Sequence, residues 1–92
     1  MIEIKLEPTL SSCIETVAKR DYERVLSILL KGEQEGTQLE EELELLRLFL
    51  ESADFGQLRS LSEEVLLSGK RVEFRLRSTG GVPEYEVEIN RV

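Results

Sequence analysis

The chain has 92 residues, of which 40% are hydrophobic, and this is enough for one folded domain with a single core. Its formal net charge of −7 is opposite in sign to the basic surplus that phosphate binding needs, so nucleic acid and anionic membranes are poor partners. The chain has no histidine and one cysteine, which excludes histidine-based catalysis, a histidine metal site and an intramolecular disulfide.

The first segment predicts a β-strand. Residues 2–7 alternate between apolar and charged side chains, the period of a strand with one buried face. Pro8 has no N–H to donate and should end the strand. The segment lacks the pattern of a signal peptide, and no apolar run reaches the length of a membrane span. Together with the single cysteine, this favours a cytoplasmic protein.

A helical pattern follows over residues 12–31, and Gly32 should end it. Asp21 falls in the middle of the apolar face of this helix, and two explanations remain open. In the first, the helix breaks near residues 19–21 and Asp21 caps a second helical segment. In the second, the helix is continuous and Asp21 is a partly buried carboxylate with a functional role. An enzyme acting through carboxylates would depend on the second alternative. Residues 33–36 read as a solvated loop.

A second helix is predicted over residues 37–53. Its principal apolar stripe is widened by Leu45, Leu48 and Phe49, so that most of its circumference is apolar. Such a helix is normally buried on more than one side. We therefore expect these three residues to form the interface of a homodimer, unless the helical layer of one chain already covers the whole helix.

A third helix should begin after Asp54, its capping residue, and end at Gly69. A β-hairpin is predicted over residues 70–90, with apolar and charged side chains alternating in both strands. A turn centred on Gly80 and Gly81 pairs three apolar residues with three others, namely Val72 with Ile89, Phe74 with Val87 and Leu76 with Tyr85. The final strand, at the end of the chain, could be an edge available for pairing across the dimer.

The predicted order is β-α-α-α-β-β in a single α+β domain, 1–92, with helices on one face of a three-stranded sheet. The other face carries a basic stripe of Arg71, Arg75 and Arg77, the candidate ligand-binding residues for RNA or an acidic peptide. Glutamates of the last strand should face these arginines, and the aromatic residues should lie on the buried face. Solvated cross-strand ion pairs are therefore the favoured interpretation of the stripe.

No catalytic or metal-binding constellation emerges from the sequence. Cys13 lies on the apolar side of the first helix, where a free cysteine is usually a small core residue. Gly80 and Gly81 lie between two strands and do not form a phosphate loop, and no metal-ligand spacing occurs. We expect no catalytic residue, no cofactor and no metal.

The interpretation that follows is a non-enzymatic protein-interaction module, homodimeric and open to a further protein partner. The alternative is a regulatory or ligand-binding module that uses the Arg/Glu face of the sheet. Among the acidic residues Glu predominates, which is typical of thermophilic proteins and also of helix-rich ones.

Overall fold

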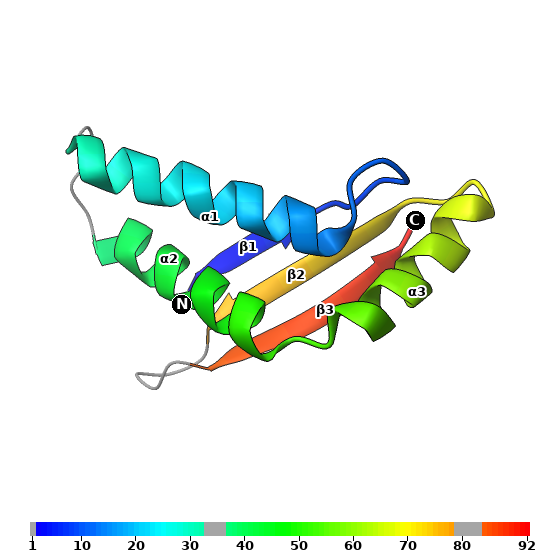
Figure 1. The fold of residues 1–92 in the computed structure, drawn as a ribbon. Coiled ribbons are helices and arrows are strands. Elements are labelled where there is room, and N and C mark those ends of the chain that lie inside the picture. The colour runs from blue at the N-terminus through cyan, green and yellow to red at the C-terminus, as the bar shows by residue number, and fades with distance from the viewer. Residues whose placement is uncertain (1, 33–36, 79–83) are drawn as a thin grey trace.

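The computed structural model describes residues 2–32, 37–78 and 84–92. Within these residues it has three helices and three strands, in the predicted order and fold class (Figure 1). In chain order the elements are β1 (Glu3–Leu6), α1 (Ile14–Lys31), α2 (Thr37–Ser52), α3 (Phe55–Leu67), β2 (Val72–Ser78) and β3 (Tyr85–Arg91).

The three strands form an antiparallel sheet in the order β1-β2-β3, so β2 is central and β3 is an edge. The helices lie over one face of this sheet (Figure 1). In β1 and β2 the alternate residues that point toward the helices are buried, and the intervening charged residues point to the open face. The alternation seen in the sequence therefore corresponds to one covered and one solvated face, as predicted.

The core lies between the sheet and the helices. Its buried members come from β1 and the residue before it, and from α1, α2 and β2; they are Ile2, Ile4, Leu6, Ile14, Ala18, Val25, Leu45, Leu46, Phe49, Val72, Phe74 and Leu76. Residues of α3 and β3 pack against this core but are only partly buried. The covered face of the sheet is thus better shielded at β1 and β2 than at β3.

The predicted break in the first helix is wrong, because α1 is continuous from Ile14 to Lys31. Asp21 is half-buried and does not act as a cap. Its Oδ1 accepts hydrogen bonds from Arg24 Nε at 2.9 Å and from Arg24 Nη2 at 2.8 Å. Because a cation one turn later neutralises Asp21, the helix can hold this carboxylate beside its apolar face. Gly32, with a φ of 66°, ends the helix as predicted.

The register of the hairpin differs from the predicted one by two residues. Leu76 pairs with Val87 and Phe74 with Ile89, and Ser78 pairs with Tyr85. A shift of two residues leaves every side chain on its predicted face, so hydrophobic alternation cannot detect it.

The charges on the open face explain which register is better. In the predicted register Glu73 would lie opposite Glu88, and like charges in that position destabilise a strand pair. In the structure Glu73 lies opposite Asn90 instead, while Arg75 faces Glu88 and Arg77 faces Glu86. The predicted turn at Gly80 and Gly81 and the predicted loop at 33–36 lie outside the described residues.

Candidate functional site

The predicted dimer interface is mostly inside the single chain. Phe49 has no exposed surface and Leu45 is only 2% exposed, so the prediction that they need a second subunit to cover them is wrong. Leu48 is half-buried. For Leu45 and Phe49 the alternative holds, because other elements of the same chain already cover the apolar circumference of α2.

Two aromatic contacts explain the burial of Phe49. Its ring packs edge-on against Phe55 of α3 at 5.3 Å and against Tyr85 of β3 at 5.7 Å between ring centroids. Tyr85 also shares a hydrogen bond with the hydroxyl of Ser52 at the end of α2. These contacts join α2, α3 and β3 and leave Phe49 no free face.

The three arginines of the predicted stripe lie on the open face of the sheet, and each has a carboxylate partner. Arg71 contacts Glu7 at 2.7 Å, Arg75 contacts Glu73 at 3.0 Å, and Arg77 contacts Glu88 at 2.8 Å. Glu3 lies within 4.0 Å of both Arg75 and Arg77.

These ion pairs affect what the stripe can bind. The hydrogen bond from Arg71 lowers the pKa of Glu7, so this carboxylate stays charged, and paired with Arg71, to a lower pH than an ordinary glutamate. A phosphate or an acidic peptide would have to displace such carboxylates to reach the arginines. The geometry therefore supports the ion-pair interpretation of Arg71, Arg75 and Arg77 more than a ligand site.

Strand β3 presents an uncovered hydrogen-bonding edge. Arg71 and Val92 exchange two backbone hydrogen bonds, of 2.6 Å and 3.0 Å. In an antiparallel strand pair, hydrogen-bonded and non-hydrogen-bonded residue pairs alternate, so every second residue of β3 counted from Val92 directs its backbone groups toward β2. The backbone groups of Tyr85, Val87 and Ile89 therefore point away from β2. Within the described part of the chain, no backbone hydrogen bond joins β3 to any segment other than β2 and its flanking residues.

The side chains on the helix side of β3 remain partly exposed. Tyr85, Val87 and Ile89 are half-buried, whereas Ile4 and Leu6 of β1 are at most 7% exposed. An incoming strand at β3 would therefore meet both free backbone groups and apolar surface. The sequence pointed to β3 as an edge, but it could not show that the helices leave this strand half-covered.

The opposite edge of the sheet, formed by β1, is poorly suited to pairing with another strand. Strand β1 has four residues, and a buried Pro8 follows it closely. Charged side chains of α1, among them Arg20 and Arg24, line an open groove with Lys5 and Glu7 along this edge. Short edges and flanking charges discourage strand pairing, so the two edges of the sheet differ in kind.

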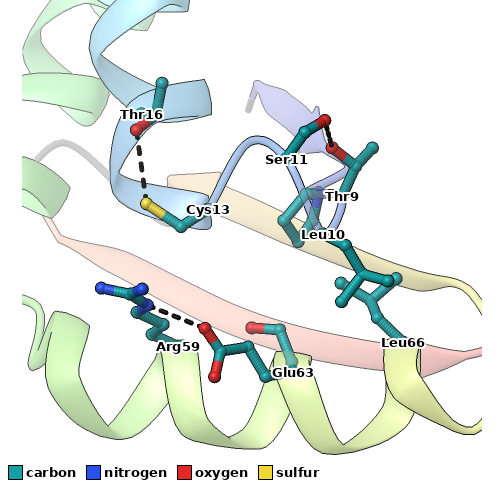
Figure 2. Close-up of a pocket in the computed structure, with 10 residues that line it drawn as sticks. Thr9, Leu10, Ser11, Cys13, Thr16, Arg59, Glu63 and Leu66 are labelled. Atoms are coloured by element: carbon teal, nitrogen blue, oxygen red, sulfur yellow. Dashed lines mark hydrogen bonds and ion pairs between the residues drawn. The ribbon is translucent and has the colours of Figure 1, made fainter.

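A cleft of about 160 Å³ lies between the loop after β1 and α3 (Figure 2). The residues that line it include Thr9, Leu10, Cys13, Arg59, Glu63 and Leu66. Cys13 is the N-cap of α1 and half-buried, so it is more accessible than the small core residue expected from the sequence. In the described ranges no three carboxylate or cysteine side chains lie close enough to bind a metal.

The thiol of Cys13 should ionise at a lower pH than an ordinary cysteine. The Thr16 hydroxyl, 3.3 Å from Sγ, contributes most to the lowered pKa, and the backbone amide of Thr16 and the charge of Arg59 act in the same direction. We expect the pH midpoint of iodoacetamide alkylation to lie below that of the unfolded chain. Thr16→Val should raise it, and Arg59→Met should raise it less. A midpoint unchanged by Thr16→Val would contradict this assignment.

Residues 1–89 match a protein-family model. The chain belongs to that family. It is also similar to an uncharacterized protein of Archaeoglobus fulgidus, with 53% identity over 49 residues, which cover 51% of this chain and 58% of the relative. The match thus spans less than two thirds of that relative's length. No solved structure matches the chain.

Neither match indicates an activity, so a function has to be inferred from the structure of the chain itself. Over residues 2–32, 37–78 and 84–92, no helix combines the length and the apolar character needed to cross a membrane.

Proposed function

We propose that the chain is a protein-interaction module without an active site of its own, and that it binds a partner by adding a strand to the edge of β3. One observation supports this more than any other. A seven-residue edge strand has outward-pointing backbone groups beside half-exposed apolar side chains. In strand addition the main-chain hydrogen bonds supply affinity, and alternate side chains supply specificity.

The residue chemistry supports the non-enzymatic part of the proposal. The chain has no histidine, the commonest general base near neutral pH. Asp21, the carboxylate singled out from the sequence, is already engaged by Arg24. A partly exposed thiol alone does not define a reaction.

A homodimer formed through β3 is the second candidate, because the same edge is present in every copy. Antiparallel pairing of two copies must place outward-pointing residues opposite each other. With Val87 opposite Val87, Glu86 meets Glu88 twice; with Val87 opposite Ile89, Glu88 meets Glu88. Pairing with Ile89 opposite Ile89 avoids these repulsions, because it sets Glu88 opposite Asn90. We expect a dimer formed through β3 to adopt this register.

The test is a proline at an outward-pointing position. Val87→Pro removes an N–H that faces away from β2, so it should block strand addition while leaving the β2–β3 pairing intact. Val87→Ala, the matched control, keeps that N–H. The readouts are sedimentation of the protein up to high micromolar concentration and NMR shifts of the β3 amides on adding synthetic strand peptides.

We expect strand addition in the unmodified protein and in Val87→Ala but not in Val87→Pro. The proposal fails if neither peptides nor a second copy perturb the amides of Tyr85, Val87 and Ile89. It also fails if Val87→Pro binds as well as Val87→Ala.

A further inference from the structure

At the edge formed by β3, the side chains on the helix side of the sheet are apolar and those on the open face are acidic. Resting on the function proposed above, we infer that the segment bound there is an extended peptide with Lys or Arg at every second position and apolar residues between them.

The acidic side comes from alternate residues of β3 that point to the open face of the sheet. Glu86 is exposed, and Glu84 just before the strand is exposed as well. In the described residues neither forms an ion pair within 4.0 Å, whereas Glu88 is bound to Arg77. Two carboxylates without a cationic partner thus stand beside the free edge.

The columns of side chains across the sheet show how these charges would be matched. One column on the open face runs Glu3–Arg77–Glu86 and the next runs Lys5–Arg75–Glu88. Both end at the edge with a carboxylate. A basic side chain on an added strand would continue the alternation in the first column and place a cation beside the carboxylate that ends the second.

The apolar side sets the other half of the pattern. Side chains of an added strand that lie opposite Tyr85, Val87 and Ile89 point to the helix side, where these residues are half-exposed. Apolar residues there would cover that surface. A partner strand with alternating basic and apolar residues therefore matches both sides, and its sequence pattern resembles that of β2, which already pairs with the other edge of β3.

A second copy of this chain is a poorer occupant than such a peptide. Each copy has a net charge of −7, and even the register that avoids Glu–Glu pairs sets Glu88 opposite the uncharged Asn90, so a second copy gives the carboxylates of the edge no cationic partner. Opposite charge across an interface speeds association and excludes like-charged partners.

The experiment compares three synthetic nonapeptides in which valine alternates with arginine, serine or glutamate, each labelled with fluorescein. Binding to the full chain is measured by fluorescence anisotropy at low and high salt. We expect the arginine peptide to bind about tenfold more tightly than the serine peptide and the glutamate peptide to bind least. Raising the salt concentration should narrow this difference.

Two variants separate a local effect from the overall negative charge. Glu86→Gln should weaken binding of the arginine peptide about twofold to fivefold. Glu41→Gln changes the net charge equally but at an exposed position of α2, and it should leave binding unchanged. Equal weakening by both variants would mean non-specific attraction to an acidic protein and would overturn the inference.

The outcomes also distinguish this inference from the function on which it rests. If the serine and arginine peptides bind equally and Val87→Pro abolishes both, strand addition stands and the basic partner is wrong. If no peptide binds but the protein forms a dimer that Val87→Pro disrupts, the occupant is a second copy. If Val87→Pro changes nothing in any measurement, both the inference and the proposed function are wrong.

Discussion

Replacing Phe49 with alanine is expected to lower the free energy of unfolding by about 3–5 kcal/mol. Phe49 is fully buried, and its ring contacts Phe55 and Tyr85 edge-on from two different elements. Since those rings are attached to α3 and β3, the cavity cannot close without moving both elements. A domain of this size has roughly 5–15 kcal/mol of total stability, so the loss would be a large part of it.

Urea unfolding followed by far-UV circular dichroism measures this loss. Leu48→Ala is the matched control on the same helix, because Leu48 is only half-buried and its truncation should cost clearly less. A Phe49→Ala protein that kept full stability but lost self-association would contradict the structure. It would restore the interface role that the sequence suggested for this residue.

Proline at two adjacent positions of β3 should have unequal effects. Glu88→Pro is expected to destabilise the protein by about 1–3 kcal/mol more than Val87→Pro, because the N–H of Glu88 points toward β2 and that of Val87 points outward. The assignment follows from the pair of hydrogen bonds between Arg71 and Val92. Removing the inward N–H also leaves a carbonyl of β2 without its donor.

Alanine at each position provides the reference, so that the loss of the side chain is subtracted from the effect of proline. The midpoints of urea unfolding are then compared within each pair. Equal costs for the two proline variants would mean that Val87 also donates a hydrogen bond in the folded chain. The edge of β3 would then already be occupied, and strand addition would have no place to begin.

Much of the fold follows from local patterns in the sequence. The alternation in the first segment and in the hairpin predicts strands with one buried face. The structure confirms that face for β1 and β2, whereas the apolar residues of β3 are only half-buried. Asp54 caps α3 as predicted, since its Oδ1 accepts a hydrogen bond from the amide of Gln57 at 3.2 Å. Caps, turns and alternation act within a few residues, and this is why one sequence is enough to find them.

The errors concern features that depend on distant residues. Asp21 suggested a helix break because an isolated carboxylate is costly on an apolar face, but Arg24 lies within reach in the continuous helix. The register was missed because a shift of two residues conserves both faces. The two registers differ in the charged pairs through Glu73, which lies opposite Glu88 in the predicted register and opposite Asn90 in the structure.

The candidate site was harder to predict than the fold for the same reason. The apolar circumference of α2 predicts that the helix is buried on several sides, but it does not tell whether residues of the same chain or of a second subunit bury it. Tyr85, which covers part of Phe49, lies far along the sequence in another element. The exposure of Val87 and Ile89 likewise depends on where the helices end over the sheet.

The inequality of the two sheet edges limits how large an assembly of these chains can become. The edge formed by β3 is seven residues long and free to pair, whereas β1 has four residues and is bordered by charged side chains of α1. Growth by strand pairing needs two receptive edges on each copy, as in cross-β fibres. With one such edge, pairing stops after a single event and gives a closed complex of defined size in place of an open-ended polymer.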